Sequence, residues 1–201
     1  MATKTAGKQD TKSALLQAGI DIMLQKGYSN TGLQEVLASL GMPKGSFYHY
    51  FQSKEEFALE IIRQVDAEYS ATILRMLRNP QETPLQRLKS YCLWGEKEFL
   101  SQDCRKGCLI GNLSQEMSDQ SEVLRKELAS VMEKRVNLFA RCIEEGQESG
   151  EITKSHTPKQ LAETLINTWG GTIMHAKTVK TKDPIDSFMT VMFDFLKAKP
   201  H

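Results

Sequence analysis

Apolar residues recur three and four positions apart along most of this 201-residue chain, and this spacing predicts helices throughout. No segment alternates apolar and polar residues in the manner of a strand. No apolar run approaches the ~20 residues that a membrane-spanning helix needs, and the polar first dozen residues do not resemble a signal peptide. We therefore expect an all-α protein that resides in the cytoplasm. The first predicted helix covers residues 11–25 and buries a stripe formed by Leu15, Ala18, Gly19, Ile22 and Met23.

Glycine, proline and helix-capping residues divide this pattern into separate helices. Gly27 is predicted to end the first helix. The pairs Thr31 with Gln34 and Ser53 with Glu56 have the spacing of a capping box, which marks a helix start. Further helices are predicted over residues 31–40, 43–50, 54–77, 120–147, 158–179 and 184–197, with one more beginning near residue 84.

Charge gives only a weak indication of the binding partner. The net charge of +1 does not by itself indicate a nucleic-acid-binding protein. The first 54 residues hold six lysines against three acidic residues, a local excess of three positive charges. This excess matters only if the lysines share one face. Lys4, Lys8 and Lys12 fit either a solvated tail or a contact with a DNA backbone.

The segment "GMPKGSFYHYFQSKEEF", residues 41–57, crowds four aromatic rings and one histidine into positions 47–51. A protein core packs aromatic rings, but charged side chains are rarely buried among them. Two short helices joined at "SLGMPK" indicate a helix-turn-helix, and residues 43–50 are then the recognition element.

The recognition element is predicted to separate inward from outward side chains. Phe47 and Phe51 are four residues apart and are predicted to pack inward. Tyr48, His49 and Tyr50 then face solvent, where hydroxyl and imidazole groups can donate hydrogen bonds to phosphate. For Tyr50, packing against the following helix is the alternative.

Three further positions complete the predicted DNA-binding surface. Gly45 removes a side chain where the helix approaches DNA closely. Lys44 lies in the leading turn and can reach base edges or phosphate. Lys54, with the free backbone N–H groups of the next helix's first turn, is predicted to form a second phosphate site.

Over residues 15–57 the chain resembles the DNA-binding domain of the TetR family of bacterial transcriptional regulators. The matching residues form an ordered series, namely "GY" at 27–28, Thr31, "GMPKGSFYHYF" and "SKEEF". Pro43 departs from the family, which often has serine or threonine there, but proline suits a first helical turn. The resemblance adds Thr31 and Ser46 to the predicted DNA contacts.

The resemblance implies a homodimer that binds a double-stranded DNA operator and a small-molecule effector, with no membrane, cofactor, metal or enzymatic activity involved. The implied fold has an N-terminal three-helix domain, a connecting helix and a C-terminal helical domain. The predicted parts are a disordered tail over residues 1–10, a helix-turn-helix domain over 11–54, a connecting helix over 55–80 and a ligand-binding and dimerisation domain over 81–201.

The most unusual segment of the C-terminal half is "QDCRKGCLIGNLSQEMSD", residues 102–119. Cys104 and Cys108 flank Arg105 and Lys106, and nearby cations favour the reactive thiolate. The segment resembles that of TetR-type regulators which sense electrophiles or oxidants, where a "GCL" cysteine precedes "LS.E..D". The corresponding residues here are Gly107, Cys108, Leu109, Leu113, Ser114, Glu116 and Asp119.

Two other interpretations of this segment stay open. Cys108 can be a small buried apolar residue in a pocket wall. Zinc binding is the third interpretation, although the C-x3-C spacing has no second pair of ligands nearby. Cys92 and Cys142 lie among apolar helical residues and are predicted to be inert parts of the core.

Trp94 and Trp169 are predicted to line a ligand cavity, because a large ring with one polar handle suits such a site. The other predicted lining residues are Tyr91, Asn112, Met117 and His175. For each residue, plain packing is the alternative. Gly170 and Gly171 interrupt a helical pattern. They permit either a close helix approach in a dimer interface formed by the last two helices or a bend beside the cavity.

Two functions from different classes follow from these features. The first is a homodimeric repressor that reads a near-palindromic operator and is released by a small molecule or by modification of Cys108. The second is a thiol enzyme, or a small-molecule-binding helical protein, that keeps a vestigial helix-turn-helix.

Overall fold

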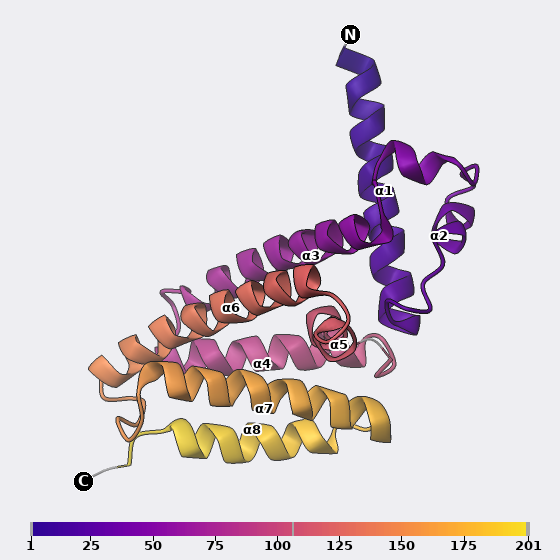
Figure 1. The fold of residues 1–201 in the computed structure, drawn as a ribbon. Helices are drawn as coiled ribbons and strands as arrows, with labels where there is room; N and C mark the ends of the chain where they lie inside the picture. Colours follow the sequence, from indigo (N-terminus) through magenta and orange to yellow (C-terminus); the bar gives the residue numbers. More distant parts are fainter. Residues whose placement is uncertain (1, 106, 200–201) are drawn as a thin grey trace. The chain divides into compact units, whose positions relative to one another are not determined.

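The computed structural model describes residues 2–105 and 107–199, with side chains described from residue 9 onward. The described residues form eight α-helices and one short 3-10 helix (Figure 1), so the all-α prediction is confirmed. One isolated β-bridge joins Ile152 to Lys197. The elements are α1 (Ala2–Lys26), α2 (Leu33–Ser39), η1 (Ser46–His49), α3 (Lys54–Leu77), α4 (Pro84–Leu100), α5 (Leu109–Met117), α6 (Glu122–Glu148), α7 (Pro158–Val179) and α8 (Asp183–Leu196).

The helices group into two compact units. The first unit joins residues 1–66 to residues 108–129, and the second joins residues 67–107 to residues 130–201. The first unit therefore contains α1, α2, η1 and α5 together with the N-terminal parts of α3 and α6. The second contains α4, α7 and α8 together with the C-terminal parts of α3 and α6. No helix among the described residues is long and apolar enough to cross a membrane.

Aromatic rings form the centre of the first unit. Phe47, Phe51 and Phe57 are almost fully buried, and their ring centroids lie 4.8 to 5.3 Å apart. The inward orientation predicted for Phe47 and Phe51 is confirmed. The predicted stripe on α1 is correct in part, because Ala18 and Ile22 stay half-exposed. The buried residues of α1 are Leu15, Leu16, Gly19, Ile20 and Met23.

Two helix starts in the first unit differ from the sequence pattern. Helix α1 begins at Ala2, ahead of residue 11, since the preceding residues include good helix formers and no proline. The capping box predicted at Thr31 is wrong, because the N-cap of α2 is Gly32, which has no side-chain cap. The Thr31 hydroxyl instead donates to the carbonyl of Gly27 at 2.6 Å.

The start of α3 is closer to the prediction. The Ser53 hydroxyl accepts a hydrogen bond from the N–H of Glu56 at 3.0 Å. The Glu56 carboxylate accepts from the N–H of Gln52, where a complete capping box would use Ser53. One half of the predicted box is therefore present.

The recognition element is shorter and tighter than an α-helix over residues 43–50. The N–H of Ser46 donates to the carbonyl of Pro43 at 3.0 Å, and the N–H of Tyr50 donates to that of Phe47 at 2.9 Å. These bonds between residues three apart define the 3-10 geometry of η1.

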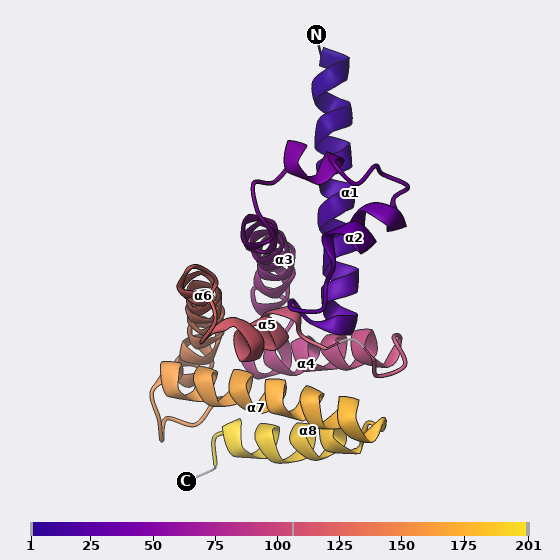
Figure 2. The ribbon, with the colours of Figure 1, turned by 45° about the vertical axis from the view of Figure 1, so that its right-hand side comes forward.

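In the second unit, α7 and α8 run side by side (Figures 1 and 2). Helix α8 also contacts α4. Helices α4 and α7 begin with complete capping boxes, Thr83 with Gln86 and Thr157 with Gln160. A proline follows each capping threonine, so the starts predicted near residues 84 and 158 are confirmed. The apolar core of this unit includes Leu88, Phe139, Ile143, Leu165 and Leu196.

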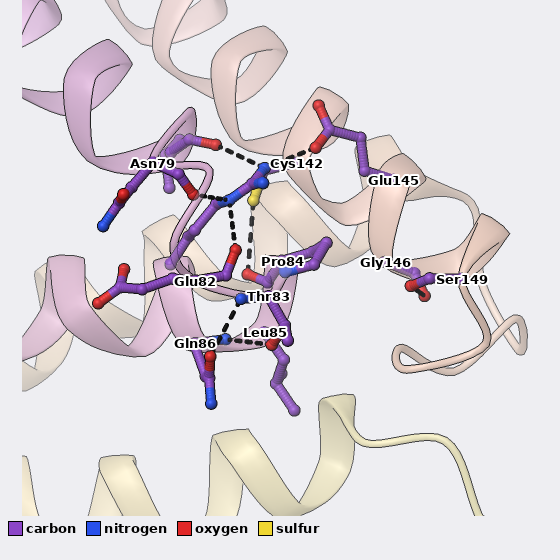
Figure 3. Close-up of polar contacts among 12 residues, drawn as sticks. Asn79, Glu82, Thr83, Pro84, Leu85, Gln86, Cys142, Glu145, Gly146 and Ser149 are labelled. Carbon is purple, nitrogen blue, oxygen red and sulfur yellow. Dashed lines mark hydrogen bonds and ion pairs between the residues drawn. The ribbon is translucent and has the colours of Figure 1, made fainter.

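Arg87 holds the connection between α3 and α4 in place. Its guanidinium donates to the carbonyls of Leu77, Asn79 and Glu82 at 2.8 to 3.2 Å, and it pairs with Glu145 of α6 at 2.6 Å. Figure 3 shows Asn79, Glu82 and Glu145 around this position. Because Leu77 is the last residue of α3, the cation caps the carbonyl end of that helix.

Candidate DNA-binding site and sensor segment

The exposed residues of the recognition element lie in η1 or directly before it. Lys44, Gly45, Tyr48 and His49 are exposed, and Tyr48 keeps 67% of its surface. The Tyr48 ring meets the buried Phe47 ring edge-on, with centroids 5.5 Å apart. The buried phenylalanine thus anchors a short helix whose polar groups point to solvent. Ser46 and Tyr50 are half-buried at its two ends.

The glycine at position 45 has no internal explanation. Its φ of −81° is open to any residue, and a β-carbon there would meet no atom within 4 Å. Neither backbone conformation nor packing within the chain requires glycine. A partner that approaches the backbone closely would account for a glycine here, so the DNA contact at Gly45 stays a prediction.

Thr31 does not share this surface. Its side chain is 1% exposed, and its hydroxyl is bound to the carbonyl of Gly27. Burial of this side chain does not favour a DNA contact through it, and the DNA contact of Thr31 stays a prediction. The hydrogen bond to Gly27 fixes the turn between α1 and α2.

Two lysines of the first unit make contacts within the chain. The ammonium of Lys54 donates to the carbonyl of Ser29 at 3.3 Å and lies 4.5 Å from the centroid of the Tyr28 ring. Burial lowers the pKa of Lys54, while the nearby Glu116 carboxylate opposes that shift. Lys12 pairs with Glu60 at 2.6 Å, so it belongs to the folded unit. A phosphate contact by Lys54 stays a prediction.

Glu116 joins α5 to the turn between α1 and α2 through hydrogen bonds. Its two carboxylate oxygens accept hydrogen bonds from the backbone N–H groups of Tyr28 and Ser29, both at 2.7 Å. Burial alone would raise the pKa of Glu116, but hydrogen bonds from Ser29 and Tyr28 and the charge of Lys54 lower it overall. The sequence motif had singled out this glutamate without giving it a partner.

The two cysteines of the sensor segment differ in surroundings. Cys108 is exposed and is the N-cap residue of α5 in the first unit, so the interpretation as a buried pocket wall is wrong. Cys104 is 7% exposed in the second unit, where it packs with Phe99 and Ile185. Lys106, one of the two cations between them, lies outside the described residues.

The backbone around Cys104 is unusual. Asp103 and Cys104 have φ of 52° and 55°, which is the left-handed region that residues other than glycine seldom occupy. The ammonium of Lys180 donates to the carbonyl of Cys104 at 3.0 Å. This contact ties the turn after α4 to the end of α7.

The remaining cysteines are core residues, as predicted. Cys92 and Cys142 are buried, and burial raises the pKa of both thiols, to about 12 for Cys142. Neither is suited to form a thiolate near neutral pH.

The predicted cavity residues divide between the two units. Asn112 and Met117 lie on α5 in the first unit, and the other four lie in the second. The Trp94 ring packs against Tyr69 and Tyr91, with centroids 5.8 Å apart in both pairs. These ring contacts favour the packing alternative for Trp94 and Tyr91.

Trp169 also has a packing role. Its ring lies 5.2 Å from that of Phe188, and a β-carbon at Gly95 would come within 2.9 Å of it. His175 is exposed in a hollow of about 530 Å³ between α7 and α8, whose lining includes Thr168, Gly171 and Phe188.

The face formed by α7 and α8 exposes apolar groups. Met174 and Val191 keep 67% and 68% of their surface. A second hollow of about 420 Å³ lies between the same helices and includes Leu161, Thr164 and Phe195 in its lining. Among the residues that the structure describes, no atom beyond the adjacent residues and the nearby backbone of α7 lies within 4 Å of a β-carbon built at Gly170 or Gly171. The two interpretations of these glycines, a close approach in a dimer interface and a bend beside the cavity, both stay predictions.

A helical chain that presents an exposed 3-10 recognition element from an aromatic core has the features of a helix-turn-helix DNA-binding regulator. Comparison with family models agrees. The model described as "Bacterial regulatory proteins, tetR family" matches residues 15–61, and "Tetracyclin repressor-like, C-terminal domain" matches residues 84–192. The chain belongs to the TetR family of bacterial transcriptional regulators.

Individual relatives extend over nearly the whole chain. The transcriptional repressor DhaR of Mycobacterium sp. strain GP1 is 37% identical over 182 residues, which cover 90% of each protein. A regulatory protein TetR from Rhodobacter sphaeroides has a crystal structure with a TM-score of 0.86 and 35% identity, covering 92% of this chain and 97% of that one. The reduced form of Escherichia coli NemR matches with a TM-score of 0.83 and 30% identity, covering 94% and 98%.

Proposed function

We propose that this protein is a ligand-responsive transcriptional repressor that binds a near-palindromic operator as a homodimer. The observation that carries this proposal is the exposed group of Lys44, Tyr48 and His49 on an element anchored by the buried ring of Phe47. In a dimer, two such elements read half-sites separated by about one helical turn of DNA or a multiple of it. The relative DhaR, which is similar over most of both chains, is named a repressor, and this supports repression as the proposed activity.

The first unit is proposed to bind DNA, and the second to bind the effector and to dimerise. Helices α7 and α8 suit the dimer interface because they expose Met174, Val191 and Phe195 on one unit. Gly170 and Gly171 add a strip without side chains, which lets a helix of a second copy approach closely. A regulator of chromosomal genes acts where the DNA lies, so we place it in the cytoplasm, without a cofactor.

The effector is proposed to be an electrophile or oxidant that modifies Cys108, or a small molecule bound without a covalent bond. Exposure of Cys108 and its place directly before α5 support the first form. The relative NemR has been crystallised in a form called reduced, and by this similarity we include an oxidant among the proposed effectors of this chain.

The test is fluorescence anisotropy of the full-length protein with the duplex upstream of its own gene and with a random duplex. We expect specific binding that N-ethylmaleimide weakens in the wild type but not in Cys108→Ser. Equal binding to both duplexes would refute the regulator. Specific binding that N-ethylmaleimide leaves unchanged in both proteins would remove Cys108 as the sensor and leave the non-covalent effector, whereas equal loss in both would place the reactive group at another residue. The thiol-enzyme alternative requires turnover without specific DNA binding.

A further inference from the structure

Glu116 joins α5 to the turn between α1 and α2 through two adjacent backbone amides. The N–H of Tyr28 donates to Oε2 and the N–H of Ser29 donates to Oε1, each at 2.7 Å. Hydrogen bonds from backbone N–H groups to an ionised carboxylate are roughly twice as strong as neutral ones. A single side chain of α5 thereby fixes the turn that leads into α2.

Two other residues shape this contact. Gly27 has a φ of +79°, and a β-carbon there would lie 2.7 Å from Oε2 of Glu116. Glycine therefore both allows the turn and leaves room for the carboxylate. Lys54, the first residue of α3, places its ammonium against the Tyr28 ring and the Ser29 carbonyl.

The other end of α5 carries the exposed thiol. Cys108 is the N-cap residue and Glu116 lies in the last turn of this nine-residue helix. Eight residues of α-helix span about 12 Å, and this helix makes only about two and a half turns. A group attached to Cys108 and the Glu116 carboxylate that holds the turn therefore lie at opposite ends of the same short helix.

Resting on the proposed function, we propose that Glu116 is the positioning residue through which displacement of α5 reaches the DNA-binding helices. While the carboxylate accepts from Tyr28 and Ser29, the turn holds α2 and Lys54 in one arrangement. An adduct on Cys108 displaces α5 and withdraws Glu116, and the turn is released. Contacts with two discrete arrangements convert a small displacement into such a change.

The experiment uses N-ethylmaleimide as the probe on the full-length protein. The Cys108 sulfur adds to the maleimide C=C bond and the thiol proton ends on the neighbouring carbon, so no oxidant is needed. The variants are Glu116→Gln, Glu116→Asp, Asp119→Asn and Cys108→Ser. Asp119→Asn is the matched control because it removes an exposed carboxylate three residues further on. Intact mass confirms a single adduct.

Residue-resolved hydrogen–deuterium exchange at the amides of Tyr28 and Ser29 is the first readout. We expect the adduct to accelerate exchange at both amides at least tenfold in the wild type and in Asp119→Asn, with no effect in Cys108→Ser. Glu116→Gln should show fast exchange without the adduct and less than a twofold further change. Glu116→Asp, which keeps the charge, should restore much of the protection and of the response.

Wild-type amides that do not respond to the adduct would overturn the role of Glu116. Slow exchange in Glu116→Gln would do the same. If Glu116→Gln fails to fold, the wild type and Glu116→Asp still test the role of Glu116, because amide exchange at Tyr28 and Ser29 is compared with and without the adduct in both proteins.

DNA binding is the second readout, by anisotropy with the duplex upstream of the protein's own gene. The ratio of dissociation constants with and without adduct should fall at least fivefold towards one in Glu116→Gln, and should stay at the wild-type value in Asp119→Asn. An unchanged ratio in Glu116→Gln would count against the proposal. Absence of specific binding by the wild type would refute the proposed function instead, and the exchange measurements would still decide the role of Glu116.

Discussion

The ring of Phe57 lies against Gly19 so closely that a β-carbon at residue 19 would come within 2.4 Å of it. The same ring touches Phe47 and Phe51, with centroids 5.3 and 4.8 Å away. Helix α1 can therefore pack on α3 only because residue 19 has no side chain. The anchoring of the recognition element depends on this approach.

Gly19→Ala should lower the free energy of unfolding by about 1–3 kcal/mol, the usual cost of overpacking a core. Urea unfolding followed by circular dichroism measures the change. Gly45→Ala is the matched control, because a β-carbon there meets no atom within 4 Å and φ is ordinary. Equal stability of Gly19→Ala and the wild type would show that the Phe57 ring moves aside easily.

Lys44→Ala should lower affinity more for the protein's own upstream duplex than for a random duplex, because we expect this exposed lysine to reach base edges. Tyr48→Phe gives the comparison. Its hydroxyl is expected to contact phosphate, so its loss should cost about 1 kcal/mol, roughly fivefold in affinity, on both duplexes. Anisotropy titrations of the wild type and both variants on both duplexes, at one fixed salt concentration, measure these affinities. A loss by Lys44→Ala that is the same on both duplexes would reassign Lys44 to the DNA backbone.

The four thiols should react in an order set by burial. Brief treatment with iodoacetamide at pH 7.5 should modify Cys108 first, because it is exposed, while Cys92 and Cys142 react only after unfolding. For Cys142, a pKa of about 12 leaves almost no thiolate at this pH. Peptide mass spectrometry gives the extent at each site, and the urea-unfolded protein is the control. Early labelling of Cys92 or Cys142 would mean that the second unit opens readily.

Some features could be predicted because they depend on neighbours in sequence. The spacing of Phe47 and Phe51 placed both rings inside, and the prolines at residues 84 and 158 gave helix starts to within a residue. The Glu116 contact could not be predicted in this way, because Tyr28 and Ser29 precede Glu116 in the sequence by 88 and 87 positions. Periodicity shows which face of a helix is apolar, but it does not show which distant turn a polar side chain meets.

The same limit applies to the cavity prediction. Trp94 and Met117 are large side chains, and their residue types alone suggest a pocket wall. Trp94 is half-buried and Met117 is buried. The structure places them in different units, each with packing partners of its own. The shortening of the recognition element to η1 was likewise invisible, since Pro43 is equally suited to begin an α-helix.

Gly171→Arg should convert the dimer to a monomer. In the described part of the chain, no atom beyond the adjacent residues and the nearby backbone of α7 lies within 4 Å of a β-carbon at this position. We therefore expect the fold to tolerate a side chain that a second copy packed against α7 does not. Size-exclusion chromatography with light scattering gives the mass. Ser130→Arg on α6 is a control for added charge at another exposed site. A Gly171→Arg dimer of unchanged stability would exclude this face as the interface.

The pH dependence of stability should report the contact of Glu116 with the turn. Its pKa is lowered in the folded protein, by the hydrogen bonds from Ser29 and Tyr28 and by the charge of Lys54, which together outweigh burial. A carboxyl group with a lowered folded pKa stabilises the fold at pH values above its unfolded pKa of about 4.3. That contribution disappears as the pH falls through the lower, folded value.

Glu116→Gln should therefore be less stable than the wild type at pH 6, and the difference should shrink as the pH is lowered from about 5 towards the folded pKa of Glu116. The reason is that protonation removes from the wild type the same charge that the substitution removes. Urea unfolding at half-unit steps between pH 6 and pH 3 measures both proteins. Asp119→Asn, which changes the net charge equally at an exposed position, controls for the overall charge. A difference in stability that stays constant across this range would mean that the ionised Glu116 carboxylate stabilises the turn no more than the protonated carboxyl group does.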